Sequence, residues 1–216
     1  MVLTGTLFNT IAVATGASIG LLSRKVLPAS AQKNILVVFG LFTLALSFQM
    51  ITEAKPSIDI FLAIVLGSLL GTLLKLDHHF SKLKLGSGFM KATLLFCVGG
   101  MTLVGCMNEG IKDDTNLLMI KGVMDLISSF FLAAALGRGV LFSAIGVLVI
   151  QGSMTIGFFY IGEQISPELV DKLTVTGGII LLALGLDLMN VKEFKILNLM
   201  PAFIILPVIH YIHSMI

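Results

Sequence analysis

Residues 139–161 read GVLFSAIGVLVIQGSMTIGFFYI, a run of 23 residues without a charged side chain. A helix that crosses the hydrocarbon core of a bilayer needs about 20 apolar residues. Lipid offers the backbone no hydrogen-bond partners, so this run is predicted to be a membrane-spanning helix. Along the whole chain 56% of the residues are hydrophobic and 12% are charged. Because a soluble domain carries about 25% charged residues, the expected surroundings of this protein are lipid.

Apolar segments on both sides of this run predict an all-α membrane helix bundle of about eight spans, which forms a single transmembrane domain over residues 1–216. The predicted spans are residues 3–22, 35–52, 58–75, 89–107, 117–136, 139–161, 170–190 and 196–214. Turn-forming and charged residues separate them. The N-terminal residues lack the basic region of a cleavable signal peptide, so we expect the first segment to remain as a span.

Charge predicts the orientation of the spans. The loops that follow the odd-numbered spans hold ten of the fourteen basic residues: Arg24, Lys25, Lys33, Lys75, Lys82, Lys84, Lys91, Arg138, Lys192 and Lys195. The loops that follow the even-numbered spans are mainly acidic. We assign to them the acidic residues Glu53, Asp59, Glu109, Asp113, Asp114, Glu163, Glu168 and Asp171 and the basic residues Lys55, Lys112 and Lys172. Because basic loops stay in the cytoplasm, both termini are predicted to lie outside.

Two pairs of similar segments indicate an internal repeat. Residues 5–13 (GTLFNTIAV) and 139–147 (GVLFSAIGV) share five of nine residues, and residues 44–50 (LALSFQM) and 182–188 (LALGLDL) share their first three. The first repeat would begin at span one and the second at span six, five spans later. Because five is an odd number, these two spans cross the membrane in opposite directions, so the repeats would be inverted, as in many secondary transporters. The predicted organisation is residues 1–77 as repeat one, residues 78–137 as a central helix pair and residues 138–216 as repeat two.

Span five carries the residues that point most clearly to a functional site. Asp125 lies about 12 Å into this span, near the middle of a hydrocarbon core about 30 Å thick, where an ionisable side chain is costly. Lys121, Ser128 and Ser129 fall on the same helical face. Two readings stay open. Lys121 and Asp125 neutralise each other in a packed interface, or Asp125 binds a cation or carries a proton and the hydroxyls complete the site.

Other polar and glycine residues extend this candidate site. Asn9 in span one and Gln151 and Ser153 in span six are candidate ligands, although amides and hydroxyls often only join helices by hydrogen bonds. Adjacent glycines within spans predict helix breaks that expose backbone groups to a substrate, and these are Gly99, Gly100, Gly177 and Gly178. We expect no cofactor and no metal, because no such motif is present and the His210 and His213 pair lacks a nearby third ligand.

Four stretches resemble one family of bacterial membrane proteins. They are GTLFNTIAVATGASIGLL (5–22), LLFCVGGMTLVGCMNEGIKDD (94–114), KGVMDLISSFFLAAALGRGVLFSAIGVLVIQGSMT (121–155) and TGGIILLALGLDLMN (176–190). These strings resemble the family known as domain of unknown function 554, the YqgA/YdfK type, over essentially the whole chain. The resemblance implies a multi-helix protein of the bacterial inner membrane. It implies no activity, because the family has none assigned.

Three functions compete. A transporter or channel for a small solute or ion, with a cation or a proton-coupled substrate favoured, fits the inverted repeat and the buried carboxylate. The alternative is a non-transporting membrane subunit or sensor that acts through protein partners. An intramembrane enzyme needs paired catalytic groups at depth, and one carboxylate lies clearly there, so we do not expect an enzyme. The net charge of +2 gives no sign of nucleic-acid binding. The small-residue pairs Gly16/Gly20 and Gly67/Gly71 permit a homodimer as well as packing within the chain.

Overall fold

The computed structural model describes residues 3–24, 26–52, 57–81, 87–161 and 165–214, which form helices and no strand. The elements are α1 (Thr4–Ser23), α2 (Ala29–Thr52), α3 (Ile58–Leu73), α4 (Leu76–Ser81), α5 (Ser87–Cys97), α6 (Gly100–Lys112), α7 (Asn116–Leu136), α8 (Gly139–Ile161), α9 (Pro167–Leu188), the short 3-10 helix η2 (Ile196–Leu199) and α10 (Ala202–Ser214). The predicted all-α helix bundle is confirmed.

Six segments within the described residues are long and apolar enough to cross a bilayer, namely α1, α2, α7, α8, α9 and η2 with α10. The pair α5 and α6 meets the same condition jointly but is bent by 59°, so it forms one broken span or a re-entrant loop. Helix α3 has 16 residues. Its length of about 24 Å is shorter than a hydrocarbon core of about 30 Å. The eight predicted segments are therefore present as helices, while eight complete crossings stay a prediction.

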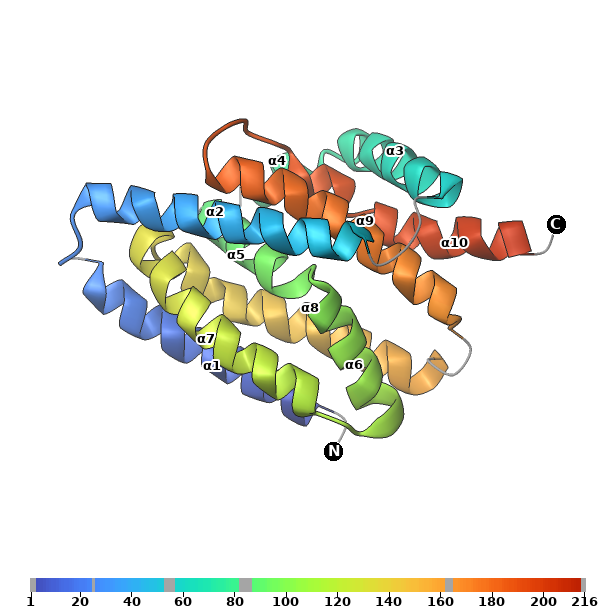
Figure 1. Cartoon of the computed structure of the whole chain (residues 1–216), viewed down its shortest axis with the longest axis horizontal. Coiled ribbons are helices and arrows are strands. Elements are labelled where there is room, and N and C mark those ends of the chain that lie inside the picture. The colour runs from blue at the N-terminus through green and yellow to red at the C-terminus, as the bar shows by residue number, and fades with distance from the viewer. Residues whose placement is uncertain (1–2, 25, 53–56, 82–86, 162–164, 215–216) are drawn as a thin grey trace.

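The broken pair α5 and α6 runs through the middle of the molecule (Figure 1). On one side α1 packs along α7 and α8, and on the other side α2 packs along α9 and α3 packs against α10. The contact between α1 and α7 is close because a Cβ atom at Gly16 or Gly20 would collide with the backbone carbonyl of Leu126 or Phe130. The small-residue spacing of α1 therefore serves packing within the chain.

Three charged residues that the sequence pattern assigns to loops instead lie buried in helices. Asp59 is in the first turn of α3, Glu109 is in the last turn of α6 and Lys172 is in the second turn of α9. The loop assignment was wrong because each residue stands within four positions of another charged residue near a true loop, namely Lys55, Lys112 and Asp171. Six further residues of the charge pattern lie outside the described residues, namely Lys25, Glu53, Lys55, Lys82, Lys84 and Glu163.

The two glycine pairs behave differently. Helix α9 runs unbroken through Gly177 and Gly178, so the break predicted there was wrong. A Cβ atom at Gly177 would lie 2.7 Å from the carbonyl oxygen of Val98, and one at Gly178 would lie 3.0 Å from that of Ser47 in α2. These glycines allow close packing around α9. The chain is interrupted at Val98 and Gly99, between α5 and α6.

Candidate functional site

A buried ion pair lies near the middle of α7. The Lys121 ammonium contacts Oδ2 of Asp125 one turn along the helix, and the two side chains are 7% and 10% exposed. The side-chain amide of Asn9 in α1 donates to the same carboxylate oxygen at 3.0 Å and to Oε1 of Gln151 in α8 at 3.1 Å. Three helices that are distant in sequence therefore meet at one polar centre within the bundle.

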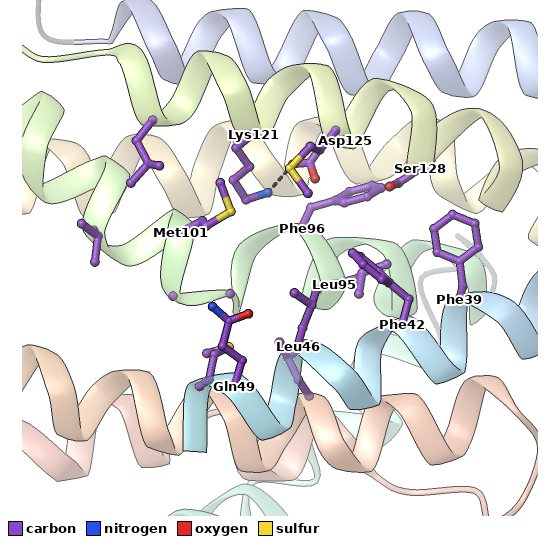
Figure 2. Close-up of a pocket in the computed structure, with 17 residues that line it drawn as sticks. Phe39, Phe42, Leu46, Gln49, Leu95, Phe96, Met101, Lys121, Asp125 and Ser128 are labelled. Carbon is purple, nitrogen blue, oxygen red and sulfur yellow. Dashed lines mark hydrogen bonds and ion pairs between the residues drawn. The ribbon is translucent and has the colours of Figure 1, made fainter. Parts of the chain in front are cut away.

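The same ion pair lines a cavity of about 270 Å³, which Figure 2 shows. Helix α7 contributes Lys121, Asp125 and Ser128 to the wall, and the dashed line in the figure marks the ion pair. Helix α2 forms the opposite wall with side chains that are mostly apolar: Phe39, Phe42, Leu46, Gln49 and Met50. The cavity therefore combines one charged wall with a largely apolar one, as small-molecule sites do.

The break between α5 and α6 brings backbone groups to this cavity. Gly99 and Gly100 line it, and a Cβ atom at Gly99 would meet nothing within 4 Å. Two hydrogen bonds from Thr102 span the break. Its backbone N–H donates to the Gly99 carbonyl and its hydroxyl donates to the Phe96 carbonyl, both at 2.9 Å. The first amide groups of a helix have no partner within that helix and carry a partial positive charge. The N-terminal end of α6 therefore adds hydrogen-bond donors to the cavity wall.

Two of the predicted site serines lie outside this centre. Ser129 faces α1, where a Cβ atom at Gly16 would collide with its hydroxyl, and it donates to the Leu126 carbonyl at 2.9 Å. Ser153 is exposed on α8 and donates to the Ile150 carbonyl at 2.9 Å, so its predicted place in the site was wrong. Both hydroxyls bond to the preceding turn of their own helix, which is a common alternative for serine.

A second buried carboxylate lies nearer the end of α6. Glu109 is 1% exposed, and its Oε1 accepts the backbone N–H of Gly5 at the start of α1. Its Oε2 accepts the hydroxyl of Thr6 at 2.9 Å and that of Thr155 in α8 at 3.3 Å. No Lys, Arg or His side chain in the described parts of the chain forms an ion pair with it. This carboxylate is therefore stabilised by hydrogen bonds and by the N-terminal end of α1.

Glu109 could not be recognised as buried from the sequence pattern, because the charged residues 112–114 begin three positions later and predict a loop. A signal was present in the spacing of Thr102, Cys106 and Glu109, which recur at steps of four and three residues, as on one face of a helix. All three are buried.

Ion pairs also join both ends of α9 to neighbouring helices. Lys172 near its N-terminal end pairs with Asp59 of α3 at 2.7 Å, and Asp187 near its C-terminal end pairs with Lys91 of α5 at 2.9 Å. The other oxygen of Asp59 lies 3.0 Å from Nδ1 of His213 in α10. These contacts tie α9 to α3, α5 and, through Asp59, to α10.

The model of the family described as protein of unknown function (DUF554) matches residues 4–211. The chain belongs to the DUF554 family. This DUF554 chain is 31% identical over 219 residues to the uncharacterized membrane protein YdfK of Bacillus subtilis (strain 168), with 96% of each chain covered. It is 26% identical over 219 residues to the uncharacterized protein YqgA of Escherichia coli (strain K12), with 93% of each chain covered. No solved structure matches it. The resemblance to DUF554 is thus confirmed, and the apolar helices together with the relative's description indicate a membrane protein.

Proposed function

We propose that the protein is a transporter or channel for a small solute or ion, with a cation or a proton-coupled substrate favoured. The observation that supports this most strongly is the Lys121–Asp125 pair at the wall of a cavity beside a helix break. Charged groups at this depth in a membrane are costly and mark substrate or ion pathways. A pair that only joined two helices would be covered by the second helix, whereas this pair faces a cavity.

The geometry supplies a means of coupling. Lys121 acts as a tethered cation on Asp125, and a substrate cation or a proton that reaches the carboxylate takes the place of the ammonium. Neither charge is stable alone in surroundings of low dielectric constant. Occupation of Asp125 therefore requires a new partner for the displaced Lys121 ammonium, and Ser128, one turn beyond Asp125, lines the same cavity. Asn9 of α1 donates to the same carboxylate oxygen of Asp125 that Lys121 contacts.

The helix contacts are those expected of an inverted repeat. An inverted repeat would have a two-fold axis that exchanges α1 with α8, α2 with α9 and α3 with α10, and the members of each of these pairs are in contact. Where α2 crosses α9, a Cβ atom at Gly40 would lie 2.9 Å from the Gly185 carbonyl oxygen, and one at Gly178 would lie 3.0 Å from that of Ser47. The offset that relates residues 44–50 to residues 182–188 also relates Gly40 to Gly178 and Ser47 to Gly185. It therefore converts the first of these two contacts into the second. In transporters of this construction the substrate binds at the repeat interface.

The test begins with thermal unfolding of the purified protein against a panel of inorganic cations and small cationic metabolites. A ligand that binds only the folded state stabilises it by about 2.7 kcal/mol at a hundredfold excess over Kd. We expect a ligand-specific shift that Asp125→Asn loses and the exposed control Ser153→Ala keeps, followed by uptake into proteoliposomes with the same dependence. A shift that survives in Asp125→Asn would show that the assigned site is wrong. No shift, with one stoichiometric partner recovered from membranes, would support the subunit or sensor reading.

We also propose that the protein lies in the bacterial inner membrane with both termini outside, on the strength of the charge alternation between loops. Single cysteines test this, because the native Cys97 and Cys106 are buried. A membrane-impermeant maleimide is expected to label Asp114→Cys in intact spheroplasts and Glu193→Cys only after permeabilisation. The reverse labelling pattern would overturn the orientation.

A further inference from the structure

The surroundings of Glu109 suit a group that alternates between two protonation states. Its Oε2 and the hydroxyls of Thr6 and Thr155 form a triangle with edges of 2.9, 3.3 and 3.3 Å. Glu109 is 1% exposed, and neither threonine is exposed at all. A hydroxyl donates to an ionised carboxylate and accepts from a protonated one. The two threonines can therefore satisfy Glu109 in either state without a change in the helix positions.

The same three helices carry a second polar layer one turn deeper, about 5.4 Å along each axis. Asn9 follows Thr6 by three residues in α1, and Gln151 precedes Thr155 by four in α8. On α6 Cys106 precedes Glu109 by three residues, and its sulfur lies 3.7 Å from the Gln151 carbonyl oxygen. This layer reaches the cavity, because the Asn9 amide donates to both Gln151 and Asp125 and Asp125 lines the cavity.

Two atoms of this deeper layer have unused hydrogen-bonding capacity. Oδ1 of Asn9 and Nε2 of Gln151 are buried and make no hydrogen bond to another described residue. Buried polar atoms are normally paired, so an unpaired acceptor and an unpaired donor in adjacent side chains need a reason. A water molecule between the layers would bond to both, because it can accept from Nε2 of Gln151 and donate to Oδ1 of Asn9. The titratable groups that face this polar column within the described residues are Cys106, Asp125 and Lys121.

We propose that Glu109 is a second proton-carrying site, which exchanges protons between Asp125 and the side of the membrane that is predicted to be outside. In the inward step the O–H bond at Oε2 of Glu109 breaks, a water molecule in the column receives that proton and releases another, and an O–H bond forms at Oδ2 of Asp125. No other bond changes. Neutral Asp125 then no longer holds the Lys121 ammonium as an ion pair. This relay rests on the proposed function, since it requires that Asp125 be loaded and unloaded.

The test uses the full chain in proteoliposomes that contain a pH-sensitive dye, with a potassium gradient and valinomycin to drive protons inward. We expect Glu109→Gln to lower the proton flux by about a hundredfold, which is the lower end of what a positioned proton-transfer group contributes. Glu109→Asp retains a carboxylate and should restore part of the flux. Glu193→Gln removes an exposed carboxylate in the loop before η2 and should leave the flux unchanged.

The outcomes separate this relay from the proposed function. Loss of proton flux in Glu109→Gln, while the ligand-induced thermal shift at Asp125 persists, supports the relay. Wild-type flux in Glu109→Gln, with flux abolished in Asp125→Asn, overturns the relay and leaves the Asp125 site standing. A wild-type protein that moves no protons also overturns the relay, even where a ligand binds. If Glu109→Gln does not fold, Thr155→Val retains the carboxylate and its bond to Gly5, and it must lower the flux if the relay is correct.

Discussion

Replacement of Lys121 by methionine tests whether the central ion pair is held by mutual neutralisation. Methionine fills a similar volume without charge, so Asp125 would keep the amide of Asn9 as a donor and lose its counter-ion. The paired side chains are 7% and 10% exposed, so water cannot replace the lost ammonium without entering the bundle. Removal of one partner from a buried ion pair costs about 3–5 kcal/mol. The ratio of folded to unfolded protein should therefore fall by about a hundredfold or more.

The double variant Lys121→Met with Asp125→Leu sharpens this prediction. It leaves no unpaired charge, and replacement of a buried pair by apolar residues is often nearly neutral. The double variant should therefore be more stable than either single variant, with a coupling energy of about 3 kcal/mol. Unfolding in mixed micelles with increasing dodecyl sulfate can be followed by pulsed maleimide labelling of Cys97 and Cys106, which are buried in the folded protein. Additive single effects of less than about 1 kcal/mol each would refute the reasoning, because they describe a solvated surface pair.

Two further predictions concern packing and the amide bridge. Gly16→Leu should abolish monodisperse elution in size-exclusion chromatography, because its side chain would collide with the backbone of α7, whereas Gly157→Ala should elute as the wild type, since nothing lies within 4 Å of its Cβ position. Gln151→Leu should destabilise the fold by about 1–3 kcal/mol, because it removes an acceptor of the buried Asn9 amide, and Ser153→Ala on the exposed face should stay within about 0.5 kcal/mol of the wild type. Equal midpoints for the last two variants would contradict the assigned hydrogen bond.

Much of the candidate site could be predicted from local spacing. Lys121 and Asp125 stand four residues apart within an apolar helix, so their pairing on one helical face follows from helix geometry alone. The same geometry could not separate Ser128, which lines the cavity, from Ser129, which faces α1. These two serines are adjacent in sequence, and the positions of α1 and α2 decide which of them is covered. Ser153 was misplaced for the same reason, since a helix inside a membrane has no polar face that marks its inner side.

The two glycine pairs show that local sequence alone does not predict whether a helix is continuous. Gly99–Gly100 and Gly177–Gly178 have the same local chemistry, and both lower the cost of a break. Only the first pair lies at a break, whereas Gly177 and Gly178 stay helical and pack closely against Val98 and α2. Helix continuity at such positions is thus a property of the neighbours and not of the pair.

The amino-acid sequence by itself determined that this chain is an all-helical membrane protein, because long apolar runs have one stable way to satisfy their backbone in lipid. It also placed Lys121 and Asp125 on one face of one helix and left their role open. Only the tertiary structure decided that Asn9 and Gln151 reach Asp125, that Glu109 is buried beside Thr6 and Thr155, and that a cavity opens at the helix break. These features join residues that lie more than a hundred positions apart or that stand at helix ends. Their environment depends on how the helices cross, and no period in the sequence encodes that.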